Sequence, residues 1–352
     1  MKTWRTEKHG GPEVIRQSDT PIPPIGPMQV RVRVEAVGLN HVDLWVQKGV
    51  EGHKFHLPIV PGGDISGIIE ELGPGSKTVL NKNGLDVGTE VLINPGVSCG
   101  QCEACLDGFD PLCRSYGMFG ETLDGGCAEY VVVPIANLIK RPKTLSAING
   151  ASLAIPYLTA WTMLTRKAQI KAGETVLIQA GGSGVSVAAT QMAKLLGATV
   201  ITTVGSDDKI DKSYALGADH VINYRKTPFR EEVKKFLAKE GKKGCEVVLD
   251  HVGADTFQES VKTLAWGGRI VTCGATSGAQ VPLDLKMVFF KNISILGSTM
   301  GSKADFIRVV QLVGSGKLKP VVDTVYPFAE LPSAFERLQN RNVFGKVVIK
   351  VS

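Results

Sequence analysis

The feature that most constrains the fold of this chain is residues 175–205, where an apolar run, a glycine-rich turn, a helical pattern and a second apolar run follow one another. TVLIQAG is typical of a buried strand, GVSVAATQMAKLLG of a helix, and TVITTVG of the next strand. Because the same alternation continues through HVINY, CEVVLDHVG, GRIVTCG and ISILGS, this half of the chain is predicted to form a doubly wound parallel sheet.

The first 150 residues have a different period. QVRVRVEAVG at 29–38 alternates polar and apolar residues, and the later runs at 64–73, 90–96 and 128–134 are also short and separated by Gly- and Pro-rich turns. This pattern favours an antiparallel, barrel-like domain. Beyond residue 301 a helical run, a Pro-punctuated stretch and a last strand, GKVVIKV, follow.

Composition excludes several function classes. The chain has 352 residues with a formal net charge of +6, and its Lys and Arg residues are scattered among acids rather than interleaved with aromatics, so nucleic acid is not an expected partner. Its N-terminus has no apolar signal region, and no apolar stretch is long enough for a membrane span, so no membrane association is expected. We therefore expect a cytoplasmic protein.

Four of the seven cysteines lie within fifteen residues. Their spacing, Cys-x2-Cys-x2-Cys-x7-Cys, lets one loop surround a metal ion with four thiolates, and a reducing compartment makes disulfides less favourable. Zinc is preferred over an iron–sulfur cluster, since the x3-Cys-Pro continuation of ferredoxins is absent. A closed four-ligand site is structural, so we predict one structural zinc held by Cys99, Cys102, Cys105 and Cys113.

The turn AGGSGVS at 180–186 lies between a strand and a helix, where a dinucleotide pyrophosphate binds. Only Gly181 keeps its place in the usual glycine fingerprint, because Ser183 and Ser186 replace the other two glycines. Val204 stands where an acid would hold the ribose of NADH, and GSDDK follows it. Ser206 and Lys209 suit a 2′-phosphate, so NADPH is favoured over NADH; the alternative is that Ser206 only caps the next helix.

Six segments in order carry a family resemblance: GLNHVDLWVQKG, VPGGDISGIIEELGPG, AIPYLTAW, AGGSGVS, LDHVG and FGKVVI. With them the chain resembles the zinc-type medium-chain dehydrogenase/reductase superfamily, most closely its quinone-oxidoreductase-like members. The resemblance implies an α/β protein with a GroES-like β-barrel catalytic domain over 1–153 and 301–352. It further implies a doubly wound parallel-sheet Rossmann domain over 154–300.

The main departure from that family concerns its catalytic zinc. The alcohol dehydrogenases bind this ion with a Cys, a His and a second Cys, and the matching positions here hold Asn40, Gly63 and Ile155. None of the three is a good zinc ligand. The proton-relaying Thr or Ser is replaced by Val42. Without a Lewis acid, reduction of an electron-poor C=C bond is favoured over oxidation of an alcohol.

The resemblance also implies site residues. Asn40 and His41 are the catalytic candidates: the Asn40 amide would donate to a substrate carbonyl or contact the nicotinamide, and His41 would reach the cofactor pyrophosphate. A turn residue at position 40 and a surface histidine at position 41 are the alternatives. The Lys346 side chain resembles a phosphate contact, with an ordinary solvated lysine as its alternative. The remaining cofactor candidates are Thr159, Gly181, Ser183, Gly184, Val185, Ser206, Lys209, Tyr224, Val252, Gly274, Ala275, Gly297 and Ser298.

The sequence thus predicts an NADPH-dependent reductase of quinones or α,β-unsaturated carbonyls, with a small electrophile as substrate and a homodimer or homotetramer as its assembly. Two alternatives remain open. One is an NAD(P)-dependent alcohol dehydrogenase with an unusual metal site. The other is a non-catalytic NADPH-binding sensor or scaffold, because a fold alone does not establish a function.

Overall fold

The computed structural model describes all 352 residues and divides into two compact units. The first unit contains Met1–Leu158 and Gly301–Ser352, and the second contains Thr159–Met300. The division falls within helix α5 (Ala154–Trp161), five residues beyond the boundary expected from the sequence. None of the helices is long and apolar enough to cross a membrane.

A seven-stranded sheet forms the body of the first unit, in the order β16-β17-β3-β4-β5-β9 with β8 also paired to β3. Its pairs are antiparallel except for β16 and β17, which run parallel. Two small two-stranded sheets, β1–β2 and β6–β7, complete the strands of this unit. The strands are β1 (Lys2–Thr6), β2 (Ile15–Asp19), β3 (Gln29–Gly38), β4 (Asp64–Leu72), β5 (Glu90–Ile93), β6 (Gly96–Val97), β7 (Gly117–Met118), β8 (Tyr130–Pro134), β9 (Leu138–Lys140), β16 (Val322–Pro327) and β17 (Lys346–Lys350).

Strand β3 shows why this unit folds as the sequence predicts. Its bounds match the alternating run, and Val30, Val32 and Val34 on one face are fully buried. The other face carries Arg31 and Arg33, which pair across to glutamates of β4. Each buried valine contributes about 1.5–3 kcal/mol through removal of its side chain from water, which fixes the register of the strand.

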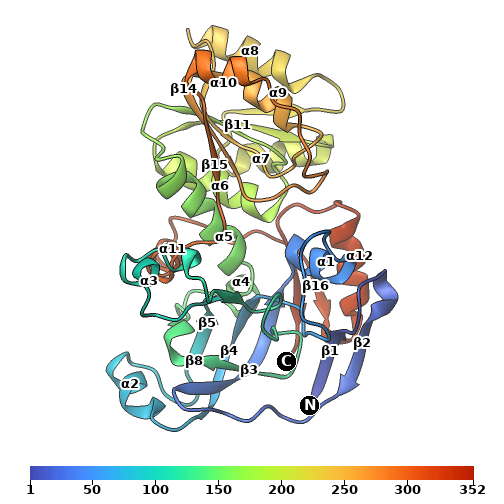
Figure 1. The fold of residues 1–352 in the computed structure, drawn as a ribbon, viewed down its shortest axis with the longest axis vertical. Helices are drawn as coiled ribbons and strands as arrows, with labels where there is room; N and C mark the ends of the chain where they lie inside the picture. The colour runs from blue at the N-terminus through green and yellow to red at the C-terminus, as the bar shows by residue number, and fades with distance from the viewer. The chain divides into compact units, whose positions relative to one another are not determined.

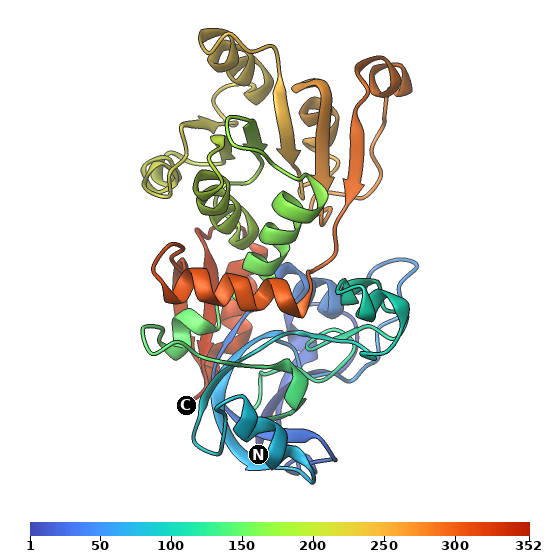
Figure 2. The ribbon, with the colours of Figure 1, turned by 90° about the vertical axis from the view of Figure 1, so that its left-hand side faces the viewer.

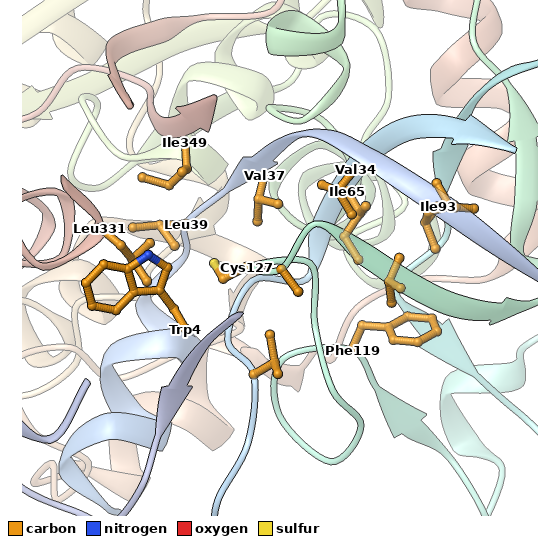
Figure 3. Packing of buried hydrophobic residues seen from close by; sticks show 14 of the residues in the cluster. Trp4, Val34, Val37, Leu39, Ile65, Ile93, Phe119, Cys127, Leu331 and Ile349 are labelled. Carbon is orange, nitrogen blue, oxygen red and sulfur yellow. The ribbon is translucent and has the colours of Figure 1, made fainter. Parts of the chain in front are cut away.

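The core of this unit gathers side chains from distant parts of the chain (Figure 3). Trp4, Val37, Ile65 and Ile349 come from four different strands and pack in one cluster. Cys127 lies inside the cluster and is completely buried, so this thiol belongs to the core and not to the cysteine loop.

Short helices surround the sheet of the first unit (Figures 1 and 2). They are α1 (His41–Lys48), α2 (Ser76–Lys82), α3 (Glu103–Leu106), α4 (Ala147–Gly150), α11 (Lys303–Gly314) and α12 (Leu331–Gln339), with 3₁₀ turns η1 (Pro12–Val14), η2 (Asp110–Leu112), η3 (Ile135–Asn137) and η6 (Phe328–Glu330).

The second unit is a six-stranded, entirely parallel sheet in the order β12-β11-β10-β13-β14-β15. This is the doubly wound arrangement that the sequence predicts, and its strand order reverses between β10 and β13. Its strands are β10 (Thr175–Ile178), β11 (Thr199–Val204), β12 (His220–Asn223), β13 (Cys245–Leu249), β14 (Leu264–Thr272) and β15 (Ser294–Gly297). Its helices are α6 (Gly184–Leu195), α7 (Ile210–Ala215), α8 (Phe229–Lys239), α9 (Phe257–Lys262) and α10 (Leu285–Lys291), with the 3₁₀ turn η5 (Asp207–Lys209) and a π-helical turn η4 (Thr162–Lys167).

Three helical segments of this unit differ from what the sequence pattern indicates. DDKIDKSYALGA at 207–218 is typical of one helix but forms a 3₁₀ turn followed by the short helix α7. ADTFQESVKTLAWGG at 254–268 is also typical of a helix, but only α9 forms, because β14 already begins at Leu264. Helix α10 was not predicted; its Asp284 side chain accepts a hydrogen bond from the backbone of Lys286 as an N-cap.

Candidate functional site

The four clustered cysteines come together in the first unit. Their sulfur atoms all lie within 4.8 Å of one another, and they form the one group of three or more His, Cys, Asp or Glu side chains in the chain that could hold a metal ion. The Cys102 and Cys105 sulfurs are 3.5 Å apart, and those of Cys99 and Cys105 are 4.0 Å apart. Tetrahedral zinc with Zn–S bonds of about 2.3 Å separates its ligands by about 3.8 Å, so the cluster fits the ion.

The pKa values of two of these thiols are shifted in opposite directions. Backbone N–H groups of Gln101 and Cys102 donate to the Cys99 sulfur and lower the pKa of its thiol to about 6, whereas at Cys102 a backbone hydrogen bond from Cys105 is outweighed by the side-chain bond with Cys105 and by burial, which raise the pKa to about 11. The thiolate is the form that binds metal. With all four coordination positions filled by protein, a zinc ion here would hold structure and leave no position for a substrate.

Asp110, within the same loop, fastens the cysteine lobe to helix α11 (Figure 1). Its carboxylate is nearly buried and accepts a hydrogen bond from the backbone N–H of Lys303 at 3.2 Å. Lys303 is the first residue of α11, so the carboxylate lies at the positive end of the helix dipole. This hydrogen bond therefore joins the cysteine lobe to the returning C-terminal segment within the first unit.

A second polar centre lies where β3 ends and α1 begins. The Lys346 ammonium donates to Asn40 Oδ1 at 2.6 Å, to Asp64 Oδ2 at 2.8 Å and to the backbone carbonyl of Leu39. Asn40 Nδ2 donates to Asp64 Oδ2 at 3.0 Å and more weakly to the Gly38 carbonyl at 3.4 Å. Asp64 is fully buried and Lys346 is 3% exposed, so this is a desolvated ion pair with nearly every polar atom bonded.

Asp43 completes this centre from the first turn of α1. Its two carboxylate oxygens accept hydrogen bonds from the backbone N–H groups of Asn40 at 2.7 Å and Gly62 at 2.8 Å. Burial nevertheless raises its pKa to about 6, because desolvation outweighs those two bonds and the Lys346 charge. Asp43 therefore orders the turn between β3 and α1 and the segment at Gly62.

The positions that hold catalytic zinc in alcohol dehydrogenases offer no ligands here. A Cβ atom at Gly63 would lie 2.7 Å from the carbonyl oxygen of Phe119 and 2.8 Å from a side-chain carbon of Ile155, so no larger residue fits without movement of backbone. The backbone N–H of Ile155 donates to Asp64 Oδ1 at 2.6 Å. The Asp64 carboxylate is thus already bonded on both oxygens, and the Lys346 ammonium is its cationic partner.

Two residues therefore have partners different from those the sequence suggested. Lys346 was expected to contact a phosphate or water, yet its three N–H bonds all end within the first unit. Asn40 is held by Lys346 and Asp64, which leaves the weak bond to Gly38 as the one a ligand oxygen would replace. His41 is the first residue of α1 and is half-buried.

Asp64 was not among the site residues predicted from the sequence. The feature that could have identified it is an acid at the first position of a strand, directly after Gly62 and Gly63, whose first four residues are all buried. An unpaired acid in such a buried strand requires a cation, and that cation, Lys346, lies 282 positions later.

In the second unit, the glycine-rich turn follows β10 as predicted. A Cβ atom at Gly181 would lie 2.5 Å from the Thr202 hydroxyl and 3.2 Å from the Thr203 carbonyl, so this position requires glycine. Ala180 before it has a positive φ of 53°, which marks the tightness of the turn. Ser183 caps α6, and Gly184 and Val185 occupy its first two positions, where the backbone N–H groups have no intrahelical acceptor.

The expected 2′-phosphate contacts lie at the carboxyl end of β11. Ser206 is the residue before η5, and Lys209 is the last residue of that turn. The Tyr224 hydroxyl would be 2.7 Å from a Cβ atom at Gly205, so glycine lets the tyrosine approach the strand end. Asp207 is held by Asn223 and Lys226, and the Lys226 hydrogen bond lowers the pKa of its carboxyl.

The other cofactor candidates follow strands of the same sheet or lie on α5. Val252 follows β13, and its carbonyl accepts bonds from the backbone and the hydroxyl of Ser277. Thr159 is buried on α5. Gly274 and Ala275 follow β14, Gly297 ends β15, and Ser298 follows it. The Ser298 hydroxyl is buried with no hydrogen-bond partner, which is the condition expected of a group that bonds a ligand.

Two protein-family descriptions match the chain. Residues 26–143 match "Alcohol dehydrogenase GroES-like domain", and residues 184–315 match "Zinc-binding dehydrogenase". Together they cover the body of both units.

Whole proteins of this kind are similar over nearly their full length. Quinone oxidoreductase of Homo sapiens is 28% identical over 99% of this chain and 97% of its own. Acryloyl-coenzyme A reductase of Sulfurisphaera tokodaii is 31% identical, covering 97% of this chain and 98% of its own. A crystal structure of an NAD-dependent alcohol dehydrogenase is 46% identical and covers 100% of both chains with a TM-score of 0.94.

Proposed function

This chain belongs to the zinc-type medium-chain dehydrogenase/reductase superfamily, and from that membership we propose that it reduces quinones or α,β-unsaturated carbonyls with NADPH and without a catalytic zinc ion. At the level of the family it is an NAD(P)H-dependent oxidoreductase with a GroES-like domain and a Rossmann-type sheet. The proposal concerns the substrate class, the cofactor preference and the role of metal.

One observation supports the proposal: the three positions that match the metal ligands of alcohol dehydrogenases hold Asn40, Gly63 and Ile155, which are poor zinc ligands, and Asn40 bonds the Lys346–Asp64 ion pair. Asn40 and Asp64 both bond the ammonium, and Gly63 has no room for a side chain. Alcohol oxidation in this family depends on a Lewis acid that lowers the pKa of the alcohol. Hydride addition to an electron-poor C=C bond instead needs orientation and a donor for the developing oxyanion.

Asn40 is the donor we propose for that oxyanion. When bound, reduced nicotinamide supplies the hydride; the protein then needs to stabilise negative charge on the substrate oxygen. The Asn40 amide is held at Oδ1 by Lys346, so its Nδ2 hydrogens have a fixed direction. Exchanging the 3.4 Å contact to Gly38 for a substrate oxygen costs little, because that contact is the weakest of its bonds.

NADPH is the proposed cofactor because of the charges after β11. No acid ends that strand, and Asp207 is neutralised locally by Lys226. Ser206 bonds the carboxylate of Asp208, which also interacts with Lys209, and both residues lie with the Tyr224 hydroxyl near this strand end as groups that suit a 2′-phosphate. The relatives' names divide on substrate, since quinone and acryloyl-thioester reduction stand beside alcohol oxidation.

The test is a screen of NADPH oxidation against quinones, enones, enoyl thioesters and aldehydes, with metal analysis of the same protein. We expect one zinc per chain, released by a thiol-modifying mercurial, and turnover that survives a chelator such as EDTA. Asn40→Ala should then lower the rate roughly 10- to 1,000-fold. Loss of turnover on chelation without unfolding, or a second zinc per chain, would overturn the metal-free mechanism.

The second candidate function is alcohol oxidation with NAD⁺, favoured by the 46% identity to a structure of that name. The same preparation distinguishes the two: alcohol oxidation with NAD⁺ that exceeds enone reduction with NADPH would replace the first proposal. Added zinc should stimulate only an alcohol dehydrogenase.

We further propose that the enzyme is at least a homodimer through the free edge of β15. Strand β15 pairs only with β14, and its neighbourhood exposes large apolar side chains. These are Trp266, Leu285, Phe289, Phe290 and Ile295. Pairing of two β15 edges about a twofold axis would bury this patch. Phe289→Glu with Ile295→Lys should give monomers in light scattering, whereas Val87→Glu, an exposed valine of the first unit, should not.

A further inference from the structure

The loop after β13 carries a histidine, His251, that no assignment above uses. Strand β10 pairs with β11 on one side and with β13 on the other, so the loops after β10 and β13 diverge at this point of the sheet. Ligands of doubly wound sheets bind outside the carboxyl ends of the strands at such a switch point. His251 and the glycine-rich turn after β10 both lie there.

The imidazole closes a chain of hydrogen bonds that runs through the turn. His251 Nε2 lies 2.8 Å from the Ser183 hydroxyl and 3.3 Å from that of Ser186. The Ser186 hydroxyl donates to the Gln179 carbonyl at 2.7 Å, and a carbonyl can only accept. The Ser183 hydroxyl therefore donates to Ser186 at 3.0 Å, and it accepts from the Ser186 backbone N–H at 3.1 Å.

This order of donors determines which nitrogen of the His251 ring carries a hydrogen. Since the single hydrogen of the Ser183 hydroxyl is used towards Ser186, the short contact to His251 needs a hydrogen on Nε2. Burial lowers the pKa of His251 below its ordinary value, although Asp250 opposes that shift. A neutral ring with its hydrogen on Nε2 satisfies both conditions.

The loop that carries His251 is held by a buried carboxylate next to it in the sequence. Asp250 is completely buried and accepts from the backbone N–H groups of Val252 and Gly253 and from the hydroxyls of Thr256 and Ser260. These bonds, between 2.7 and 3.1 Å, fix the loop on both sides of His251. The ring therefore has a rigid base.

The geometry points to His251 as a positioning residue for the dinucleotide pyrophosphate: by donating to Ser183 it holds the cap of α6, so that the N–H groups of Gly184 and Val185 face the phosphate. This inference rests on the proposed dinucleotide site. It also explains the departure from the glycine fingerprint. Serine hydroxyls at 183 and 186 would otherwise occupy the space where the phosphate binds. Their hydrogen bonds to His251 and to the Gln179 carbonyl direct them away from that space.

The experiment measures Kd for NADPH and for adenosine 2′-monophosphate, which lacks the pyrophosphate. His251→Ala should weaken NADPH about 5- to 20-fold, the loss of one or two hydrogen bonds, and leave the fragment within about twofold. His251→Gln, whose amide can donate from a similar position, should restore most of the affinity. His220→Ala is the matched control, because His220 stacks on Phe236 in the same unit and lies outside the turn.

A double-mutant cycle isolates the proposed partner. In a Ser183→Gly background the hydroxyl that makes the short contact to His251 is absent and only the 3.3 Å contact to Ser186 remains, so adding His251→Ala should weaken NADPH binding by less than about twofold. An undiminished loss in that background, equal losses for NADPH and the fragment, or no loss at all would each overturn the inference. Unfolding midpoints of all variants identify any that merely fail to fold.

These readouts need no turnover, so they separate this inference from the proposed function. A protein that binds NADPH with the His251 dependence above but reduces no quinone or enone would refute the reaction and keep the positioning role. A protein that binds neither NADPH nor NADH would refute both.

Discussion

The polar centre of the first unit consists of charged side chains, whereas that of the second unit consists mainly of neutral groups. The first unit uses formal charges removed from water: Asp43, Asp64 and Lys346 are each at most 3% exposed. The second unit lines its turn with neutral groups, namely serine hydroxyls, an imidazole and backbone N–H groups, and keeps its one buried carboxylate, Asp250, beneath them.

Under the proposed function, the difference follows from the ligand that each centre would bind. A dinucleotide brings its own negative charge, so a site for it needs donors and no competing fixed anion. A neutral carbonyl brings none, so a site that stabilises its developing oxyanion needs an amide with a fixed orientation, and an ion pair supplies that rigidity at the cost of desolvation. Three substitutions test whether this contrast holds.

Lys346→Met should have the largest effect. It leaves Asp64 fully buried with no cation, so the free energy of unfolding should fall by about 3–5 kcal/mol, measured by urea or thermal unfolding. Adding Asp64→Asn should recover part of the loss. Lys350→Met, at the exposed end of the same strand, is the control. A loss below about 1 kcal/mol would mean that the charges of the first unit are not the basis of its rigidity, and the contrast with the second unit would fail.

Asp43 should make the first unit sensitive to pH. Its folded pKa of about 6 lies above the ordinary 3.8, so between these values the folded chain binds a proton that the unfolded chain has lost. The free energy of unfolding should therefore fall as pH rises through this window, by up to about 3 kcal/mol, relative to Asp43→Asn. Unfolding midpoints at several pH values between 4 and 6.5 measure it. A difference that does not vary with pH would contradict the prediction, and Asp86→Asn, in an exposed turn, is the control.

Lys209→Ala should have the smallest effect and act on binding alone. Removing one charge-assisted contact to a 2′-phosphate should reduce the preference for NADPH over NADH roughly 10-fold, with stability unchanged. Titration of both nucleotides against the variant and against Lys212→Ala provides the measurement. Equal affinities of the unmodified protein for the two nucleotides would show that this end of β11 does not select the phosphate.

Local patterns made much of this structure predictable. The alternation of β3, the order of strands and helices after residue 175 and the spacing of the four cysteines each involve residues close in sequence. The missing zinc ligands at 40, 63 and 155 were also readable, because they are single-residue departures within recognisable segments.

The rest depends on pairings between distant residues that carry no local signal. From the sequence alone Lys346 could be an ordinary solvated lysine, and only the fold places Asp64 beside it. In the same way His251 could be any loop residue, and only the fold brings it within hydrogen-bond distance of Ser183, 68 positions earlier. Helix α10 was missed because five of its seven residues, LKMVFFK, are apolar and only Met287 and Val288 pack against the core, so the sequence lacks the one-sided apolar period that predicts a helix.

The place of β17 in the sheet has a consequence for synthesis on the ribosome. This strand lies between β16 and β3, so β3 emerges early and keeps one edge partly unpaired until residues 346–350 arrive. At about 5–20 residues per second, the roughly 190 residues that separate Leu158 from this strand take ~10–40 s to translate. The continuous second unit is completed within that interval, whereas Asp64 has no Lys346 to pair with until its end. The nascent first unit is therefore the part of this protein that has to be kept from aggregating, and the arrival of one lysine both closes its sheet and neutralises its buried acid.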